Sequence, residues 1–401
     1  MEPNQTSTPV LTLMPATEKE VVDAVRSAIQ NNLEVRVVGA GHSFSPLVTT
    51  TGLLIDLGRL SGITGIDSDR NRVRMHAGTP ISALGESLWK QGLALSNQGD
   101  IDKQTIAGAI ATATHGSGLE LGSFSSSLRW VKLVDGRGEI REIAETDIRE
   151  LKAAQVALGS LGVFLEVELE VSPRYHLAEE ITYPKWQETL DGWDVNVRSN
   201  RHYSFMWLPD ADSAALYELD VPSGESMANR SYTKRYNAVD LYEPEGISLV
   251  ANHRRDRAYR IYPGTFGLPF HELEYFVPVA QGRDAVTAIQ HLMLDRHPDQ
   301  KYPLEVRWVR GEDAYLSPFF NRDTTSLSVS GEPGTNYLPY LRDFDSVLQD
   351  FQARAHWGKI HFLTRDRITD LYPEYEAFLQ VRREFDPDNV YLNEHARELV
   401  G

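Results

Sequence analysis

The chain has 401 residues, a length that predicts two domains at roughly 100 to 200 residues per domain, with three as the outer limit. Its composition, 41% hydrophobic and 24% charged, is that of a globular protein and excludes disorder, collagen-like repeats and coiled coils. The 40 Lys and Arg residues against 57 Asp and Glu give a formal net charge of −17, so nucleic acid and membrane surfaces are not expected partners. The substrate should be neutral or held by local charge.

The absence of cysteine from the sequence excludes disulfides, thiolate metal sites and thiol nucleophiles. Any redox chemistry must therefore come from a cofactor. The first residues lack a basic region followed by an apolar stretch, and no apolar run approaches the ~18 residues that span a bilayer. We expect a soluble, cytoplasmic protein, and the sequence carries no signal of its oligomeric state.

The first part of the chain predicts alternating helices and strands. Thr17 and Glu20 form a capping box ahead of a helical pattern that stops at Asn31. Strands are predicted at 35–38 and 73–76, and a helix at 80–91. Residues 165–171 alternate between apolar and Glu side chains, which is typical of a strand with one buried face.

The pattern changes near residue 174, where the alternation ends and longer polar stretches with scattered Trp and Tyr begin. Strand-like alternation returns at 304–309 and 325–329, and the chain from 366 onward is helical and charged. We therefore predict an α+β fold with two domains, 1–174 and 175–365, followed by a C-terminal segment, 366–401.

A glycine-containing loop follows the strand at 35–38. It consists of Gly39, Ala40, Gly41, His42, Ser43, Phe44, Ser45 and Pro46. The third glycine of a dinucleotide fingerprint would fall at Phe44, and Pro46 discourages the helix that must follow, so the Rossmann interpretation fails. The loop can still direct backbone N–H groups at a pyrophosphate, and a purely structural turn is the alternative.

A second glycine-containing loop contains Thr112, Ala113, Thr114, His115, Gly116, Ser117 and Gly118. Two phosphate-binding loops at this separation could clamp one dinucleotide, because hydroxyls add donors and glycines permit close backbone approach. Taken singly, this loop is a weak signal.

Two short charged motifs remain. Glu305 and Arg307 lie at i and i+2 on a predicted strand, where they form either a surface ion pair or, if both faces of the strand are covered, a pair that orients a hydroxyl and stabilises negative charge. Lys359 lies among Trp357, Ile360 and Phe362, so it either is solvated or points into a partly apolar site.

No metal site is predicted, because the spacing of His356 and His361 suits neither a helix nor a strand. The remaining basic cluster should only neutralise nearby acids; it consists of Arg254, Arg255, Arg257 and Arg260.

These motifs, in this order, resemble the flavoproteins of the vanillyl-alcohol oxidase and p-cresol methylhydroxylase superfamily, and most closely their sugar-1,4-lactone oxidase branch. The resemblance rests on VVGAGHSFSPL (37–47), LALSNQGDIDKQTIAGAIATATHGSG (93–118), EVRWVRGEDAYLSPFFNRD (305–323), HWGKIHF (356–362), LYPEYEAF (371–378) and DPDNVYLN (386–393). It covers the first ~170 and last ~100 residues and is weak between about 180 and 270.

The resemblance implies a two-domain fold of the p-cresol methylhydroxylase type. Residues 1–174 would form an FAD-binding domain, 175–365 a substrate-binding cap domain with an antiparallel sheet, and 366–401 a segment that packs back on the FAD domain. FAD would be bonded covalently to His42. The implied cofactor-binding residues are Gly39, Ala40, Gly41, His42, Ser43, Gly99, Gly108, Thr112, Thr114, His115, Gly116, Gly118 and Val163.

The resemblance also implies the chemistry. Glu305, Arg307 and Lys359 would be catalytic, and substrate would be bound by Asp100, Ser328 and Ser330. The expected reaction is FAD-dependent oxidation of an aldono-1,4-lactone such as L-gulono-1,4-lactone at C2, giving an ascorbate-type product, with hydride transfer to flavin N5 and re-oxidation by O2 to hydrogen peroxide.

Other functions remain open at this point. Alditol oxidases share the Glu-x-Arg pair and the HWGK segment, although the NQG and RGEDAYLSPFFNRD stretches favour the lactone branch. An NAD-linked dehydrogenase is opposed by Phe44, and a binding protein without turnover by the retained charged residues. Gly99 either leaves a path for oxygen to the flavin or merely provides a turn with positive φ.

Overall fold

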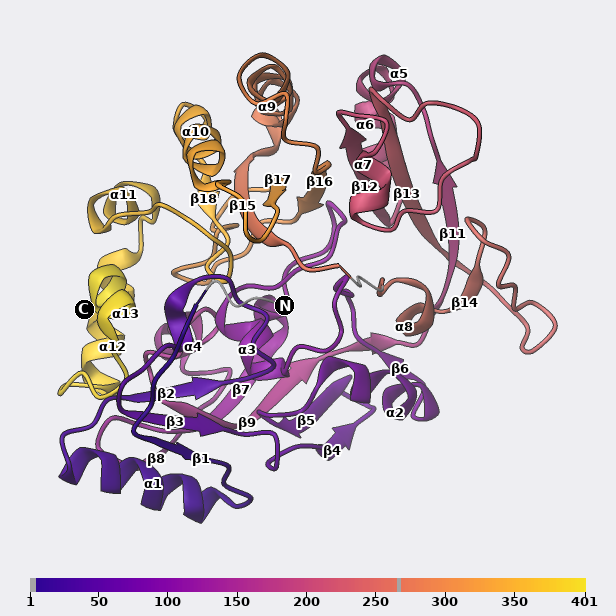
Figure 1. The fold of residues 1–401 in the computed structure, drawn as a ribbon. Coiled ribbons are helices and arrows are strands. Elements are labelled where there is room, and N and C mark those ends of the chain that lie inside the picture. Colours follow the sequence, from indigo (N-terminus) through magenta and orange to yellow (C-terminus); the bar gives the residue numbers. More distant parts are fainter. Residues whose placement is uncertain (1–4, 265–267) are drawn as a thin grey trace.

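The computed structural model describes residues 5–264 and 268–401 and, within these ranges, contains four β-sheets (Figure 1). Three of them are built from residues before 174, which we call the N-terminal part. The fourth, which we call the cap sheet, has eight strands and lies above the N-terminal part in Figure 1. Within the described ranges, no helix has the length and apolar character that a bilayer crossing requires.

The N-terminal part combines a parallel and an antiparallel sheet. The three-stranded parallel sheet has the order β1 (Leu11–Leu13), β3 (Leu53–Asp56), β2 (Val35–Val38). The five-stranded antiparallel sheet has the order β4 (Ile63–Asp67), β5 (Arg72–His76), β9 (Val163–Glu170), β7 (Leu128–Val134), β8 (Ile140–Ile143). The third sheet pairs β6 (Leu93–Ala94) with β10 (Ser172–Pro173). The helices of this part are α1 (Glu18–Gln30), α2 (Leu84–Lys90), α3 (Ile106–Ala111) and α4 (Ile148–Ala154).

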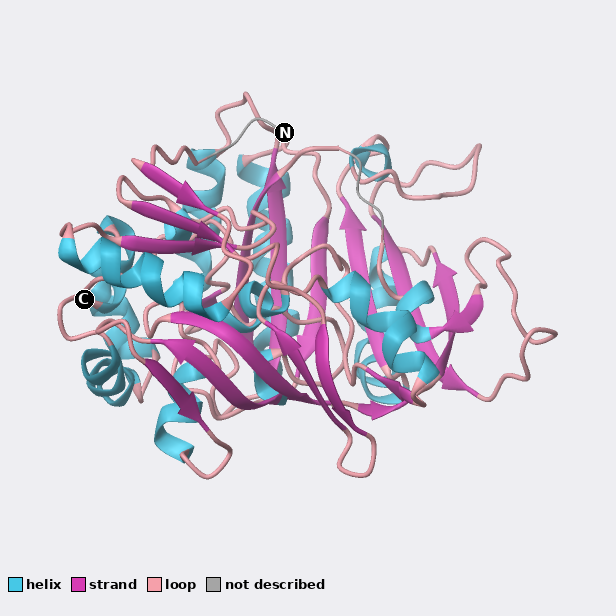
Figure 2. Cartoon of the chain, turned by 90° about the horizontal axis from the view of Figure 1, so that it is seen from below, coloured by secondary structure: helices cyan, strands magenta, loops and turns pink. Residues whose placement is uncertain are grey.

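The cap sheet is antiparallel throughout. Its order is β14 (Arg255–Arg257), β11 (His176–Thr182), β13 (Arg230–Val239), β12 (His202–Leu208), β16 (Leu304–Val309), β17 (Thr324–Gly331), β15 (His271–Pro278), β18 (Arg354–Ala355). The helices between these strands are α5 (Trp186–Asp191), α6 (Trp193–Ser199), α7 (Ser213–Leu216), α8 (Ala258–Ile261), α9 (Gly282–Arg296) and α10 (Leu338–Gln349). Seen from below, helices lie between and around the separate groups of strands (Figure 2).

The cap sheet has one apolar and one polar face. The strand register places Glu305 opposite Ser328 and Arg307 opposite Ser326, so these side chains share a face. Trp308 points to the other face, where its ring lies 5.0 Å from that of Trp193 in α6, between centroids. Helices α9 and α10 pack against β15 and β17. Helices therefore cover the apolar face, and the polar face is left to meet the N-terminal part.

The C-terminal segment returns to the N-terminal part, as Figure 1 shows by its yellow helices beside β2. It contains α11 (Arg365–Leu371), α12 (Tyr375–Phe385) and α13 (Glu394–Val400). The backbone N–H of Val35 donates to Val390 O at 2.8 Å, and the amide of Asn393 donates to Pro46 O at 2.8 Å. The segment thereby supports both β2, which precedes the first glycine-containing loop, and Pro46 at the end of that loop.

The strands and helices predicted from sequence periodicity are present, except that the helix predicted at 80–91 is a 3-10 turn at Ile81–Ala83 followed by α2 at Leu84–Lys90. Thr17 Oγ1 accepts from the Glu20 N–H, and the Glu20 carboxylate accepts from the Ala16 N–H at 2.7 Å, which closes the start of α1. The α+β class with an antiparallel cap sheet is also confirmed. The exact domain boundaries stay predictions, although β10 ends at Pro173 and the cap sheet begins at His176.

The basic cluster neutralises acids, as expected. Arg254 pairs with Glu179, and Arg257 pairs with both Glu243 at 2.7 Å and Glu86 at 2.9 Å. Because Glu86 belongs to α2 and Arg257 to β14, this cluster connects the N-terminal part to the edge of the cap sheet.

Two half-buried histidines, whose ring nitrogens are buried, join the C-terminal segment to the loop after β18. The rings of His361 and His395 lie 5.6 Å apart between centroids, and both nitrogens of His361 and Nε2 of His395 make no hydrogen bond within the described structure. Burial lowers the pKa of His361 to about 3 and that of His395 to about 4. Both are therefore neutral in the folded protein at pH 7.

We predict that the free energy of unfolding decreases as the pH falls from 6.5 towards 4. The unfolded chain binds protons on these histidines near pH 6.5, whereas the folded protein does so only near pH 3 to 4, and each contributes at most about 1.4 kcal/mol per pH unit. Urea unfolding at several pH values should show a smaller slope for the His361→Leu, His395→Leu double variant. The exposed His253→Gln control should keep the wild-type slope; an unchanged slope in the double variant would contradict the prediction.

Candidate active site

Two adjoining cavities lie at the junction of the N-terminal part and the cap sheet. The larger cavity, of about 430 Å³, is lined by the first glycine-containing loop, by α3 and by residues near Leu158. The smaller cavity, of about 80 Å³, is lined by both glycine-containing loops and by the polar face of the cap sheet. His42, Ser43, Gln104 and Thr112 line both cavities, so these residues mark the place where the two meet.

The larger cavity fits the cofactor that the resemblance implies. Its size is within the range of small-molecule sites. Gly41 has a φ of +70°, and a Cβ at that position would meet no atom within 4 Å, so the loop backbone is open to the cavity. Predicted cofactor residues that line the cavity are Gly39, Ala40, Gly41, His42, Ser43, Gly108 and Thr112. A dinucleotide bound here would reach the smaller cavity at His42.

The environment of His42 favours its neutral form. Burial lowers the pKa of His42, and the positive charges of Lys359 and Lys103 lower it further. A neutral imidazole keeps a lone pair on one ring nitrogen at neutral pH. His42 is therefore a neutral imidazole that lines both cavities.

Arg307 is the central charge of the smaller cavity. It is 7% exposed, and its Nη1 lies 3.0 Å from Asp100 Oδ2 and its Nη2 lies 2.7 Å from Glu274 Oε1. Glu305 is a more distant partner, with 3.8 Å between its Oε2 and Arg307 Nε. The surface ion pair considered for Glu305 and Arg307 is therefore wrong, because Arg307 is buried and held mainly by carboxylates from other segments.

The carboxylates around Arg307 fall into two kinds. Burial alone would raise the pKa of Glu274, but Arg307 and His115 outweigh it and hold this pKa well below its usual range. Burial raises the pKa of Glu305, and the charge of Asp100 adds to this effect although Arg307 opposes it. Different pKa values of neighbouring acids are typical of active sites in which one acid holds a proton and another stays ionised and stabilises positive charge.

Lys359 also points into the smaller cavity. It forms an ion pair with Glu272, and its Nζ lies 5.2 Å from the centroid of the Phe44 ring. Ser328 Oγ donates to Glu272 Oε1 at 2.5 Å, so β17 fixes the carboxylate that holds the lysine. Lys359 therefore lines the smaller cavity and is paired with Glu272, while its catalytic role stays a prediction.

Some of the remaining predicted site residues line the smaller cavity, and others line neither cavity. Asp100, Thr114 and His115 line the smaller cavity. Those that line neither cavity are Gly99, Gly116, Gly118, Val163, Ser328 and Ser330. The N–H of Gly118 donates to Trp308 O at 2.7 Å, which docks the second loop on β16, and Ser330 Oγ lies 2.6 Å from the Tyr217 hydroxyl. Their assignment to cofactor or substrate stays a prediction.

Sequence reasoning missed three side chains of the smaller cavity. Glu272 and Glu274 come from β15, and His356 comes from the loop after β18. The first two alternate at i and i+2 within HELEYF, the same signal that singled out Glu305 and Arg307. That signal was available in the sequence.

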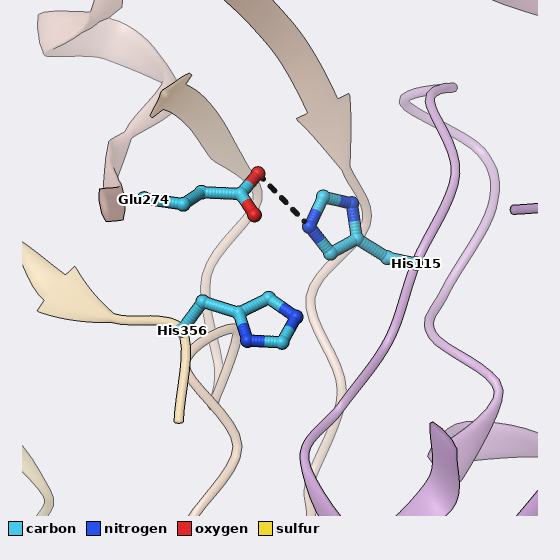
Figure 3. A group of neighbouring side chains, drawn as sticks. All are labelled: His115, Glu274 and His356. Carbon is cyan, nitrogen blue, oxygen red and sulfur yellow. Dashed lines mark ion pairs between the residues drawn. The ribbon is translucent and has the colours of Figure 1, made fainter. Parts of the chain in front are cut away.

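His115, Glu274 and His356 form a cluster whose potential ligand atoms lie within 4.8 Å of one another (Figure 3). His356 Nδ1 accepts the Gly358 N–H at 3.0 Å, so its Nε2 carries the proton. A histidine in this tautomer offers no lone pair at Nε2 for a metal ion. We therefore assign no metal to the cluster.

Comparison with known families gives two matches. Residues 9–144 match a family described as an FAD binding domain, and residues 221–399 match one described as D-arabinono-1,4-lactone oxidase. Most residues that line the larger cavity lie within the first match, whereas the smaller cavity is lined by residues of both matches.

Individual relatives match over nearly the whole chain. An L-gulono-1,4-lactone dehydrogenase of Mycobacterium tuberculosis is 31% identical and covers 99% of this chain and 97% of its own. The mouse L-gulonolactone oxidase is 27% identical over 98% and 95%, and a Streptomyces alditol oxidase is 27% identical over 96% and 94%. Among solved structures, cholesterol oxidase from Brevibacterium sterolicum has the same fold, with a TM-score of 0.82 at 16% identity over 97% of this chain and 94% of its own.

Proposed function

Because the chain belongs to the family of FAD-dependent aldonolactone oxidases and dehydrogenases, we propose that it oxidises an aldono-1,4-lactone of the L-gulono-1,4-lactone type. Oxidation at C2 turns the secondary alcohol into a ketone, whose tautomer is an ascorbate-type enediol. The observation that carries this proposal is the group formed by the buried Arg307 and the half-buried Glu305 and Lys359, which lines a cavity that meets the larger cavity at His42.

The proposed roles follow from charge and position. FAD bound in the larger cavity would supply a two-electron acceptor that takes a hydride at N5. Glu305 forms hydrogen bonds to the substrate hydroxyls and orients them, or accepts their proton. Arg307 and Lys359 stabilise the negative charge that develops on the substrate oxygen and on the reduced cofactor.

The charge balance of the smaller cavity supports a neutral substrate. Within the described residues, Arg307 is paired with Asp100 and Glu274, Lys359 with Glu272, and Lys234 with Asp100 at 3.2 Å. A sugar acid would bring a further negative charge without finding an unpaired cation here. A lactone or a polyol carries only hydroxyls and fits this balance.

An alditol oxidase is the second candidate, since the Streptomyces alditol oxidase matches 96% of this chain. A steady-state screen of aldonolactones and alditols with oxygen detection separates the two. Turnover of alditols without turnover of any lactone would overturn the first choice.

We also propose O2 as the electron acceptor, with hydrogen peroxide as product, and a cytoplasmic location.

We predict covalent FAD on His42. The protein should show flavin fluorescence on a denaturing gel. His42→Ala should abolish it, because the variant lacks the imidazole nitrogen that is proposed to bond to the flavin. The Ser43→Ala control changes the adjacent cavity residue and should keep the fluorescence. Fluorescence that survives in His42→Ala would refute the assignment.

We predict that Glu305→Gln and Arg307→Ala each slow reduction of the flavin by substrate. Removing a partner of developing charge typically costs about 100-fold or more in rate. Anaerobic stopped-flow absorbance gives the rate, and flavin content checks cofactor binding. Glu312→Gln is a suitable control, because Glu312 bonds to Ser123 and Ser317 and lines neither cavity. If both active-site variants reduce the flavin at the wild-type rate, Glu305 and Arg307 have a structural role only.

We predict that Gly99→Ala slows re-oxidation by O2 about tenfold, a barrier increase of about 1.4 kcal/mol, while flavin reduction by substrate stays near the wild-type rate. Gly99 is not among the glycines with positive φ in the described residues, so the turn interpretation is wrong. An added Cβ would lie 3.5 Å from Phe124 Cε2 and 3.7 Å from Ile101 O, which are ordinary contacts that the fold accommodates. Stopped-flow measurement of both half-reactions tests this; unchanged re-oxidation would exclude a role of Gly99 in oxygen access.

A further inference from the structure

Glu272 is a buried carboxylate of β15, and both of its oxygens have a partner. The residue is 6% exposed. Its Oε1 accepts a hydrogen bond from Ser328 Oγ at 2.5 Å, and its Oε2 forms the ion pair with Lys359 Nζ. Among the residues that the structure describes, Glu272 is the one acid that pairs with this ammonium group. The bond from β17 therefore fixes the carboxylate in the orientation that meets Lys359.

The next pair along the two strands is built in the same way. Ser326 Oγ donates to Glu274 Oε1, and this carboxylate pairs with Arg307. The strand β17 is buried along its whole length, where a hydroxyl needs a partner. The hydroxyl of Ser328 thus has a partner within the protein, and it acts on the site through the carboxylate that it holds.

The loop that carries Lys359 is held by backbone bonds on both sides. The N–H of Phe44 donates to Gly358 O at 2.7 Å, and the N–H of Ile360 donates to Glu272 O at 2.9 Å. The loop is therefore fixed between the first glycine-containing loop and β15 by bonds that do not involve the lysine side chain. This argues against a purely structural role for the ion pair.

The ammonium group of Lys359 lies where the two cavities meet. Its Nζ is 5.2 Å from the centroid of the Phe44 ring, and its charge contributes to the lowered pKa of His42. Lys359 lines the smaller cavity, and His42 lines both cavities. A cofactor ring that reaches the smaller cavity at His42 would therefore lie in the electrostatic field of this cation.

We propose that Glu272 is a positioning residue that offsets the charge of Lys359 beside the flavin and thereby sets the midpoint potential of the flavin. A positive charge stabilises the anionic reduced cofactor, and an ion pair without net charge stabilises it less. This inference rests on the proposed function, because the role of Lys359 towards the reduced cofactor is taken from there. Without the offset, the flavin would hold its two electrons more tightly and pass them to O2 less readily.

Midpoint potentials of the holoenzyme, measured by dye equilibration without any sugar, test the proposal. Glu272→Gln keeps the size of the side chain and can still accept from Ser328, but it removes the negative charge. We expect the equilibrium between oxidised and two-electron-reduced flavin to shift towards the reduced form by about tenfold, which is a rise of about 30 mV. Sulfite, whose adduct at flavin N5 also leaves negative charge on the ring, should bind more tightly to the same variant.

Glu179→Gln is the matched control. Glu179 is 5% exposed and forms an ion pair with Arg254 in the same sheet, but it lines neither the larger nor the smaller cavity. Its flavin should keep the wild-type potential. An unchanged or lower potential in Glu272→Gln, or an equal rise in Glu179→Gln, would overturn the proposal.

A double variant tests whether Glu272 and Lys359 act as a pair. The ion pair and the Glu272→Gln, Lys359→Met combination both carry no net charge. The double variant should therefore have a potential closer to that of the wild type than to that of Glu272→Gln. A potential as high as in Glu272→Gln would show that Lys359 is not the charge that Glu272 offsets, and the proposal would be wrong.

Glu272→Asp repeats the test if the Gln variant does not retain flavin. Its shorter side chain moves the negative charge away from Lys359, so the potential should again rise, and the absence of a rise would then refute the proposal. If no lactone or alditol reduces the flavin, the proposed function fails, whereas the potentials still decide the role of Glu272.

Discussion

The structure of the site depends on the burial of one guanidinium. Arg307 is 7% exposed at the contact between the N-terminal part and the cap sheet, where an uncompensated charge is strongly unfavourable. Its two close partners come from opposite sides of that contact, since Asp100 follows β6 and Glu274 belongs to β15. Removing one partner of such a pair typically costs about 3 to 5 kcal/mol. The ion pairs therefore fix how the cap sheet sits over the loops that line the larger cavity.

The same guanidinium divides the roles of the acids around it. Glu274 lies 2.7 Å from Arg307 and stays ionised, whereas Glu305 lies 3.8 Å away, is desolvated and has a raised pKa. A difference of about one ångström in the distance to Arg307 thus helps to separate the pKa values of two glutamates that look equivalent in the sequence. Asp100 connects this network to Lys234 on β13, so the charges extend across several strands of the cap sheet.

Local patterns in the sequence predict local structure well. The capping residues of α1, the alternation of β9 and the shared face of Glu305 and Arg307 all depend on neighbours within a few positions. The partners of Arg307 do not follow from such patterns, because Asp100 is 207 positions away and Glu274 is 33 positions away. Their proximity depends on the strand order β16-β17-β15 and on the docking of the second loop on β16. Neither is encoded in any short window of the sequence.

Contacts on both faces of the cap sheet specify its strand register. This explains how a stable fold can contain a buried polar face. A slip of one residue in β16 would turn Glu305 and Arg307 towards the helices and Val306 and Trp308 towards the site. On one side that slip would break the contact between Trp308 and Trp193, and on the other it would leave Asp100 and Glu274 without their cation. The aromatic packing thus stabilises the observed register of β16. The ion pairs make any other register unfavourable, because it would leave buried charges without partners. A site built from several charged side chains needs both, because the charges alone specify an arrangement without stabilising it.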